Sequence, residues 1–212
     1  MSAPANISYQ AEIGRKAIHI LALVVPGFMF FVDRGTCLTF FLPVAAFALA
    51  LELLRTRSKT VSVFISKYFG RWMRPEEATT EPARLKLNGA TWIMLSATLL
   101  ALIVVIPLPY AGASLAMFML GDAAAALIGR RWGRTPLWPG EKTLEGTLAF
   151  FVVGSIFMAF LIHPVIPWPL GILAAATAAL LEWLPLPLND NIRVPVLVAG
   201  LITILQDGPI VG

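Results

Sequence analysis

Long apolar runs that contain few charged residues recur along almost the whole length of this 212-residue chain. Only 13% of the residues are charged, whereas soluble domains average about a quarter. This composition leaves too little polar surface to cover a globule in water, so we expect the protein to lie in lipid. Seven runs approach the roughly 20 mostly apolar residues that a helix needs to span a bilayer. These runs are residues 15–32, 36–54, 87–106, 109–129, 146–163, 168–186 and 192–206. The sequence therefore predicts an all-α, polytopic membrane protein with about seven transmembrane helices.

The remaining composition argues against several other classes of protein. Because Cys37 is the only cysteine and there are only two histidines, we expect neither an internal disulfide nor a metal site built from these residues. The formal charge of +4 fits contact with the anionic headgroups of membrane lipids. No nucleic-acid-binding motif is present, so we expect no nucleic-acid partner. No repeat or linker divides the chain, which predicts one integral membrane catalytic domain over residues 1–212.

The basic residues indicate how this domain is oriented in the membrane. With seven spans, the N-terminal tail and the segments 55–86, 130–145 and 187–191 lie on one side. Fifteen of the sixteen lysines and arginines fall on that side, and Arg34 alone falls on the other. Positive residues stay preferentially in the cytoplasm. We therefore expect a protein of the cytoplasmic (inner) membrane with a cytosolic N-terminus and a cytosolic active site.

The segment 55–86 combines eight basic residues with an apolar stripe at helical spacing. The stripe consists of Val61, Phe64, Ile65, Tyr68, Phe69 and Trp72. Such a pattern predicts an amphipathic helix that lies in the headgroup layer with its apolar face toward the lipid. A cytosolic helix that packs this face against the protein core is the alternative.

Ionisable residues within the apolar runs are the first candidates for a functional site, because a charge in a membrane span is costly unless it is paired or hydrated. The four such residues are Glu52, Asp122, Glu145 and Glu182. Each lies near the cytosolic end of its run, whereas a transporter places such groups near the midplane of the membrane. Their positions therefore favour a reaction at the membrane surface.

The run that contains Asp122 continues into small residues on the same helical face. Ala126, Gly129 and Gly133 follow Asp122 at positions i+4, i+7 and i+11. A face with almost no side chains lets a flat or phosphorylated ligand approach the backbone closely. Packing of small residues against a neighbouring helix is the alternative, but it leaves the aspartate unexplained.

A basic loop follows this helix and ends at the start of the next one. Three arginines precede Lys142, and Thr143 is placed to cap the new helix. Cations, a capped helix N-terminus and the nearby Glu145 are the parts needed to bind a magnesium polyphosphate. The Walker pattern is absent, so this loop is not a P-loop. Membrane topology and headgroup contact are the alternative explanation for the arginines.

Two further polar stretches lie on the expected cytosolic side. The turn at residues 189–191 contains Asp190 between two asparagines, which are residue types that turns also favour for structural reasons. Near the N-terminus, Arg15 and His19 are four residues apart and share a helix face, with Lys16 beside them. We interpret His19 as a core residue.

Four stretches of the chain resemble the CTP-dependent lipid kinases, a family that includes dolichol kinase, phytol kinase and a diacylglycerol kinase. They are EIGRKAIHI at 12–20, LNGAT at 87–91, GDAAAALIGRRWG…EKTLEG at 121–146 and E…DNIRVP at 182–195. The third stretch is the most specific, because it matches the family's CTP-binding pattern residue by residue. The matching residues are Asp122, Ala125, Gly129, Gly133, Lys142, Thr143, Glu145 and Gly146. Glu141 replaces the first lysine of that pattern, and the spacer before it is one residue shorter.

The resemblance implies an enzyme that transfers the γ-phosphoryl group of CTP to the hydroxyl of a lipid alcohol such as dolichol, polyprenol or phytol, with Mg²⁺ as cofactor. We expect the catalytic residues to be Asp122, Lys142 and Asp190. The expected nucleotide-binding residues are Gly129, Gly133, Lys142, Thr143, Glu145 and Gly146, with Arg15 and Lys16 as helpers. The expected Mg²⁺ ligands are Asp122, Glu145 and Asp190.

Two other functions are compatible with the sequence. A cytidylyltransferase would use CTP, Mg²⁺ and phosphatidate to make a CDP-lipid, and a lipid transporter or scaffold would bind anionic headgroups through residues 55–86. The stretch from Lys142 to Gly146 and the carboxylates on one side favour the kinase. The choice of CTP rests on the resemblance alone. The particular lipid alcohol and the oligomeric state, a homodimer included, are left open.

Overall fold

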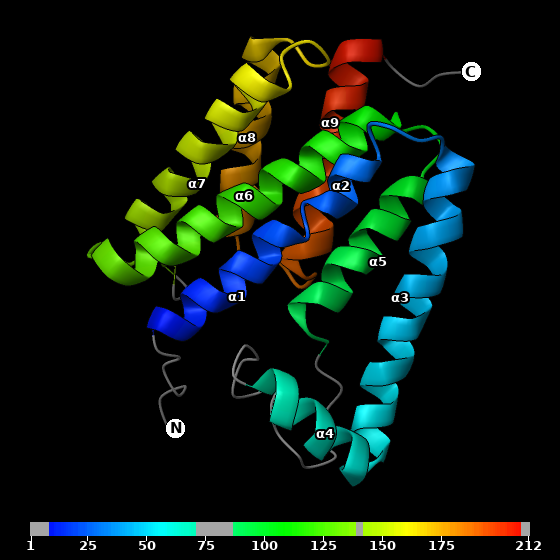
Figure 1. The fold of residues 1–212 in the computed structure, drawn as a ribbon. Coiled ribbons are helices and arrows are strands. Elements are labelled where there is room, and N and C mark those ends of the chain that lie inside the picture. Colours follow the sequence, from blue (N-terminus) through cyan, green and yellow to red (C-terminus); the bar gives the residue numbers. More distant parts are fainter. Residues whose placement is uncertain (1–8, 71–86, 139–141, 209–212) are drawn as a thin grey trace.

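The computed structural model describes residues 9–70, 87–138 and 142–208, and within these ranges the chain is almost entirely helical (Figure 1). This described part contains no β-strand beyond one isolated bridge between Pro136 and Thr143. The all-α prediction is therefore confirmed for these residues. The helices are α1 (Tyr9–Leu21), α2 (Val24–Phe28), α3 (Arg34–Arg57), α4 (Lys59–Phe69), α5 (Gly89–Leu102), α6 (Leu108–Trp132), α7 (Leu144–Ile156), the π-helical continuation η2 (Phe157–Leu161), α8 (Trp168–Trp183) and α9 (Asp190–Asp207).

Three helices are long and apolar enough to cross a membrane, namely α3, α6 and the segment Leu144–Leu161 formed by α7 and η2. Helices α5 and α8 are also apolar but shorter, with 14 and 16 residues. Helix α9 has 18 residues and carries the charged side chains of Asp190, Arg193 and Asp207. These helices are compatible with integration into a membrane, whereas the number of seven spans stays a prediction.

The first expected span, residues 15–32, does not form a single helix, which corrects the prediction from sequence. Helix α1 ends at Leu21, and the short α2 begins at Val24. Pro26 accounts for the break, because it has no N–H to donate to the carbonyl of Ala22 and its ring would clash with that carbonyl in a continuous helix.

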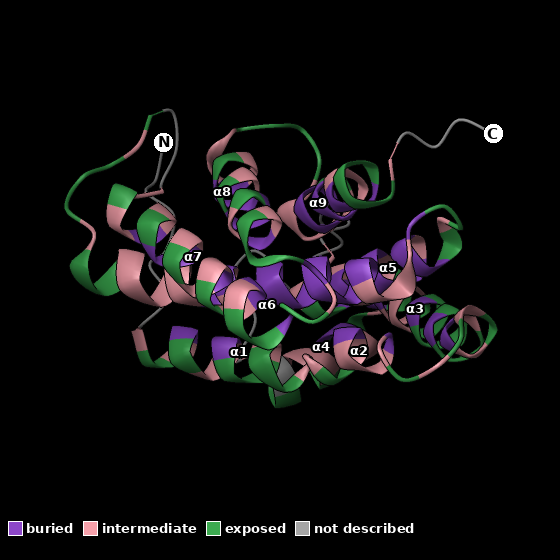
Figure 2. Cartoon of the chain, turned by 90° about the horizontal axis from the view of Figure 1, so that it is seen from above, coloured by how far each residue is buried: buried purple, intermediate pink, exposed green. Residues whose placement is uncertain are grey.

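Helix α6 lies at the centre of the bundle and contacts α1 and α2 on one side and α7, α8 and α9 on the other (Figure 2). Every residue from Tyr110 to Met119 is buried, as expected for a helix that is apolar around its whole circumference. Gly121 lets α7 approach, because a Cβ atom there would lie 2.8 Å from the ring of Phe150. The outer faces of the bundle expose large apolar side chains, such as Phe47 on α3, which suits contact with lipid.

Consecutive long helices run in alternating directions, so that their ends gather at two poles of the bundle (Figure 1). The C-terminal ends of α3, α6 and α8 lie at the lower pole of that view, together with α4 and the N-terminal ends of α1, α5, α7 and α9. We call this pole the charged end, because it contains Lys16, Asp122, Lys142 and Asp190. The fold thus gathers residues that are far apart in the sequence.

Arg34 lies at the other pole and holds the end of α5 in place. Its two Nη atoms donate to four backbone carbonyl oxygens at distances of 2.6–3.3 Å. The four carbonyls belong to Ala101, Ile103, Val104 and Ile106. The C-terminal end of a helix leaves carbonyls without intrahelical partners, and Arg34 supplies donors to them. The basic residue that departs from the charge asymmetry therefore has a structural role.

An Arg34→Met variant should unfold at a lower temperature than the wild type, with a loss of about 2–3 kcal/mol in the free energy of unfolding. Methionine keeps the apolar stem of the side chain but removes the charged donors. Thermal unfolding in detergent, followed by circular dichroism, measures the change. The control is Arg57→Met at the exposed end of α3, which should change the stability by at most about 0.5 kcal/mol. Equal losses in both variants would contradict the capping role.

Candidate functional site

Helix α1 places two basic side chains against Asp122 of α6. Lys16 is only 2% exposed, and its Nζ atom forms an ion pair with Oδ2 of Asp122. His19, three residues later on α1, has its Nε2 atom 3.5 Å from the same oxygen. Packing of small residues did not explain why an aspartate lies in this apolar helix. The structure gives Asp122 a buried cationic partner, Lys16, on another helix.

A second carboxylate on α1 forms an adjoining set of ion pairs. Glu12 is fully buried and accepts hydrogen bonds from Arg15, one turn later. The Nε atom of Arg130 on α6 lies 3.7 Å from the same carboxylate. Arg15, which the sequence spacing placed on one face with His19, therefore points toward Glu12.

Residues 135–137 and 142–144, between α6 and α7, pair in antiparallel orientation and so position Lys142. The backbone N–H of Leu137 donates to the carbonyl of Lys142 (2.8 Å), and that of Leu144 donates to the carbonyl of Thr135 (2.9 Å). The carboxylate of Glu145 accepts hydrogen bonds from the backbone N and from Oγ1 of Thr135, both at 3.2 Å. Glu145 thus fastens the beginning of this segment to the start of α7.

Thr143 caps α7, as the sequence predicts, and also fills the space beside three glycines. Its Oγ1 atom accepts a hydrogen bond from the backbone N–H of Gly146 (3.2 Å). A Cβ atom at Gly129 would lie 3.0 Å from this oxygen, and one at Gly133 would lie 2.7 Å from Cγ2 of Thr143. The glycines therefore let α6 pack closely on α7, which is the alternative that the sequence left open. Close approach of a nucleotide is not needed to explain them.

Replacing Gly133 by alanine should destabilise the contact between α6 and α7. The added Cβ atom would lie 2.2 Å from the carbonyl oxygen of Gly129 and 2.7 Å from Thr143, so the backbone must shift. We expect a loss of about 1–3 kcal/mol in the free energy of unfolding, measured by thermal unfolding in detergent. In the matched control, Gly200→Ala, the Cβ atom meets no described atom within 4 Å, so this variant should be at least as stable as the wild type. Wild-type stability of Gly133→Ala would refute this account of the packing.

Lys142 connects two carboxylates at the end of α8 and the start of α9. Its Nζ atom lies 2.8 Å from Oε1 of Glu182 and 3.0 Å from Oδ2 of Asp190, and it also donates to the backbone carbonyl of Glu182. Arg193 forms an ion pair with the other oxygen of Asp190, Oδ1. Asp190 therefore lies between two cations, and the turn that contains it is part of an ionic network.

The Lys16–Asp122 pair and the Lys142 group both lie toward the charged end, within electrostatic range of each other. The negative charges of Asp122 and Asp190 both act on Glu182, so both lie within electrostatic range of that residue. The side chains of Asp122, Lys142 and Asp190 are 28%, 34% and 34% exposed. The fold thus brings the three residues that we expect to be catalytic to one end of the bundle and leaves each of them partly open to a ligand.

Glu145 does not join the other two expected magnesium ligands, because its carboxylate is bound to Thr135. Within residues 9–70, 87–138 and 142–208, no three carboxylate, histidine or cysteine side chains gather in a way that could hold a metal ion. Mg²⁺, however, commonly takes one or two protein carboxylates and completes its octahedral shell with phosphate oxygens and water. Of the three expected ligands, Asp122 and Asp190 are partly exposed and pair with Lys16 and Lys142 respectively.

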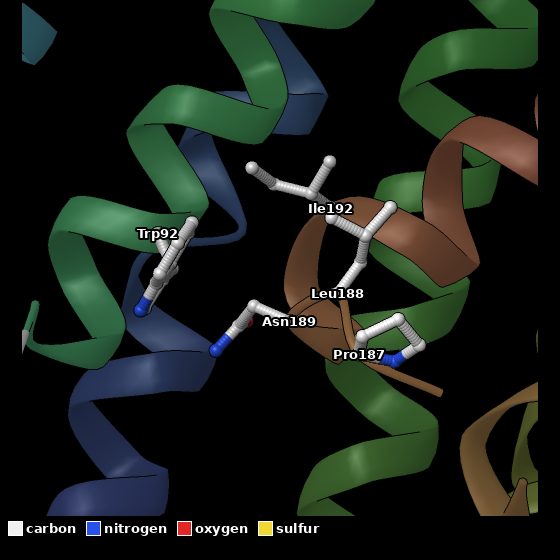
Figure 3. Close-up of a pocket in the computed structure, with 5 residues that line it drawn as sticks. All are labelled: Trp92, Pro187, Leu188, Asn189 and Ile192. Carbon is white, nitrogen blue, oxygen red and sulfur yellow. The ribbon is translucent and has the colours of Figure 1, made fainter. Parts of the chain in front are cut away.

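A cavity of about 370 Å³ opens beside the start of α9 (Figure 3). It is lined by Trp92 of α5, by Pro187, Leu188 and Asn189 of the loop after α8, and by Ile192 of α9. The lining is mostly apolar, and Asn189 directly precedes Asp190 in the chain. The cavity and the Lys142 group therefore share the first turn of α9.

The amphipathic helix expected in segment 55–86 is confirmed as α4, and Phe64 and Tyr68 on it point away from the protein. Phe64 and Tyr68 are exposed, with their ring centres 4.8 Å apart, whereas Ser62 is buried. The alternative in which the apolar stripe packs against the core is therefore wrong for these two aromatic residues. Trp72, the last residue of the predicted stripe, lies outside the described residues.

Sequence reasoning named Glu182 as a candidate but gave it no specific role, and it assigned no role at this site to Arg193 or Glu12. A signal for Arg193 was present, because it follows Asp190 by three residues on a helix, the spacing at which opposite charges pair. Glu12 precedes Arg15 by the same spacing. The pairing of Glu182 with Lys142 has no such signal, since the two residues lie on different elements and meet only through the fold.

Comparison with known proteins finds one distant full-length likeness. The chain is 24% identical over 193 residues to the uncharacterized protein RP860 of Rickettsia prowazekii (strain Madrid E), and the match covers 88% of this chain and 91% of that protein. No protein-family model matches the chain, and no solved structure matches it. The likeness therefore extends over nearly all of both proteins, and it carries no description of an activity.

Proposed function

We propose that this protein is a CTP-dependent kinase that transfers the γ-phosphoryl group to the hydroxyl of a polyprenol-type lipid alcohol at the cytosolic face of the cytoplasmic membrane. The observation that carries the proposal is the ionic cluster at the charged end. Lys142 pairs with Glu182 and Asp190 there, and the ion pair of Asp122 with Lys16 lies toward the same end. Such a cluster at the end of an apolar bundle lies where a lipid hydroxyl and a water-soluble nucleotide can meet.

Phosphoryl transfer requires this combination of charges more than it requires covalent catalysis. Cations neutralise the phosphate oxygens, and the attacking and leaving oxygens must be held in line. Lys142 is the partly exposed cation of the cluster, and we assign it to the β- and γ-phosphates. The sequence predicts that Lys16 helps to bind the nucleotide. Because Lys16 is buried against Asp122, we assign it instead to positioning that carboxylate.

In the proposed reaction, the lipid hydroxyl attacks the γ-phosphorus of CTP and a new O–P bond forms. The bond from the γ-phosphorus to the bridging oxygen breaks, and CDP leaves with the bonding electron pair. The hydroxyl proton passes to the carboxylate of Asp122 or Asp190. Mg²⁺ supplies neutralisation of the triphosphate when it is bound, and the same two aspartates are the residues that would hold it. The cavity beside Asn189 is the proposed place for the hydroxyl end of the lipid.

The surface of the bundle supports a location in the membrane. Large apolar side chains are exposed on the outer faces of the helices, including the long apolar helix α3. Helix α4 lies at the charged end and exposes Phe64 and Tyr68, with Lys59 and Lys67 on the same short helix. Aromatic and basic residues together favour the headgroup layer of an anionic membrane. The active site would then lie beside the headgroups on the cytosolic side.

The test is an activity matrix in which the purified protein receives each of the nucleoside triphosphates with phytol, farnesol, a polyprenol, dolichol, diacylglycerol or phosphatidate. Phosphorylated lipid and CDP, formed from CTP and an alcohol, are the expected products. Pyrophosphate and a CDP-lipid, formed from phosphatidate, would identify a cytidylyltransferase instead. A protein that changes no lipid in the presence of any nucleotide would reject both enzymes and leave a transporter or scaffold.

A further inference from the structure

The cavity beside the start of α9 lies between the first turns of α5 and α9, which both begin at the charged end (Figure 3). Pro187, Leu188 and Ile192 form an apolar wall, and the indole ring of Trp92 faces this wall from α5. The volume is about 370 Å³, whereas an apolar cavity of about 150 Å³ holds one benzene molecule. By that measure this cavity has room for roughly fifteen carbon atoms.

Two N–H groups in the lining of this cavity are not used by the protein. The side-chain Oδ1 atom of Asn189 accepts hydrogen bonds from the backbone N–H (3.0 Å) and from Nδ2 (2.8 Å) of Asn191. Because a backbone N–H can only donate, this contact identifies the oxygen of the Asn189 amide, and the other atom is the donor Nδ2. Neither this Nδ2 atom nor Nε1 of Trp92 has an acceptor among residues 9–70, 87–138 and 142–208.

The two free donors lie on one side of the cavity. Figure 3 shows the nitrogen atoms of Asn189 and Trp92 on the side away from Pro187 and Leu188. No charged side chain of the described residues lines the cavity. An anionic group would therefore lack a cation here, whereas a neutral oxygen atom would find N–H donors at one side and its hydrocarbon chain would find apolar surface at the other.

We propose that this cavity binds the hydroxyl end of a single-chain lipid alcohol, and that Asn189 and Trp92 are the residues that recognise its oxygen. Nδ2 of Asn189 and Nε1 of Trp92 donate to that oxygen, and the first carbons of the chain lie against Leu188 and Ile192. Asn189 directly precedes Asp190, so the oxygen is held one residue from a carboxylate to which we assign the hydroxyl proton. The choice of an alcohol rests on the proposed function.

The size and lining of the cavity define which alcohols it accepts. A diacylglycerol carries two ester groups next to its hydroxyl, and these would lie against Leu188 and Ile192 without donors. A single chain brings no such groups. Because the cavity has room for roughly fifteen carbons, the length of farnesol, the rest of a longer chain lies outside in the membrane. Affinity should therefore rise with chain length up to farnesol and then stay constant.

The experiment measures the binding of tritium-labelled farnesol to the full-length protein in detergent micelles, by scintillation proximity and without any nucleotide. The competitors are geraniol, geranylgeraniol, a long polyprenol, diacylglycerol and farnesene, which has the carbon skeleton of farnesol but no hydroxyl. All are compared at equal mole fraction in the micelles, so that their partition into detergent does not contribute. Circular dichroism and gel filtration show whether each variant is folded.

Three variants alter the cavity, and two variants serve as matched controls. Ile192→Trp fills the cavity, Trp92→Phe keeps an aromatic wall without the N–H, and Asn189→Ser keeps an oxygen that can cap α9 without the amide nitrogen. Ile204→Trp makes the first change at an exposed position near the other end of α9. Trp168→Phe makes the second change at an exposed tryptophan at the start of α8.

Ile192→Trp should bind farnesol at least about 10-fold more weakly than the wild type, because its ring occupies the apolar space. Trp92→Phe and Asn189→Ser should each lose about 3-fold to 10-fold, the value of one hydrogen bond. Both controls should bind as the wild type does. Geranylgeraniol and the polyprenol should compete as well as farnesol, whereas geraniol, farnesene and diacylglycerol should compete less well.

Folded cavity variants with wild-type affinity overturn the proposal, and so does a wild type that binds no farnesol. Equal competition by farnesene and farnesol would reject the donors, and equal competition by diacylglycerol would reject the single-chain specificity. Binding that depends on the cavity in a protein without CTP-dependent kinase activity would keep the site and reject the proposed reaction. Kinase activity that is unchanged in Ile192→Trp would keep the reaction and reject the cavity, so the two failures are distinguishable.

Discussion

A Lys142→Met variant should transfer the γ-phosphoryl group of CTP about 10²–10³-fold more slowly than the wild type. The substitution removes a fixed positive charge that would stabilise the negative charge developing on the phosphate oxygens in the transition state. Lys142 is partly exposed and is the cation that joins Glu182 to Asp190. Methionine has a similar length and keeps contact through its apolar stem. We therefore expect the variant to fold and to lose activity mainly in kcat. The measurement is the rate at which label passes from γ-labelled CTP to a lipid alcohol.

The control for this variant is Lys67→Met on the exposed face of α4. Both substitutions remove one positive charge from the charged end, but only Lys142 contacts the carboxylates of the site. Lys67→Met should keep the catalytic rate of the wild type and alter at most its dependence on anionic lipid. If the two variants lose the same activity, the effect is one of general membrane charge and the role of Lys142 is wrong.

The second large effect is expected at the pair of Lys16 and Asp122. In Asp122→Asn, Lys16 would keep its charge in a buried position with no anion in contact, and breaking such a pair costs about 3–5 kcal/mol. This variant should lose both stability and kinase activity. In the double variant Lys16→Met/Asp122→Asn, neither charge is present. It should regain most of the stability, because no unpaired charge is then left buried.

The double variant separates the structural part of this pair from the catalytic part. Thermal unfolding reports the stability, and phosphorylated lipid reports the activity, with both measured on the same preparation. We expect restored stability together with activity that remains at least about 100-fold below the wild type. Recovery of activity along with stability would mean that Asp122 only holds α1 against α6, and its proposed role in catalysis would be withdrawn.

Much of the helical fold was predictable because the pattern of apolar residues is long and continuous. The run at 109–129 corresponds to α6 (Leu108–Trp132), and the run at 168–186 corresponds to α8 (Trp168–Trp183). The interruption between α1 and α2 was not predicted, since apolar residues continue through it and only Pro26 marks the break. Hydropathy therefore identified where the helices lie, whereas the backbone chemistry of Pro26 determines where α1 ends.

The site was predictable in its residue types but not in its pairings. A carboxylate in an apolar run must find a partner, and this requirement singled out Glu52, Asp122, Glu145 and Glu182, each of which has a partner in the structure. The cation that each carboxylate contacts depends on how α1, α6, α8 and the residues just before α7 pack together. The spacing of residues along the sequence does not indicate this packing. The glycines show the opposite case, since they match the nucleotide-binding pattern while the structure explains them by the contact of α6 with Thr143.

The most direct test of the central claim is the binding of a divalent metal together with CTP, measured with Mn²⁺ in place of Mg²⁺ by electron paramagnetic resonance. It requires no knowledge of the acceptor lipid. We expect the wild type to take up Mn²⁺ when CTP is present and much less when CTP is absent. The folded double variant Asp122→Asn/Asp190→Asn should lose this CTP-dependent uptake. Equal uptake of Mn²⁺ and CTP by the double variant and the wild type would contradict the claim that these carboxylates hold a metal-bound triphosphate.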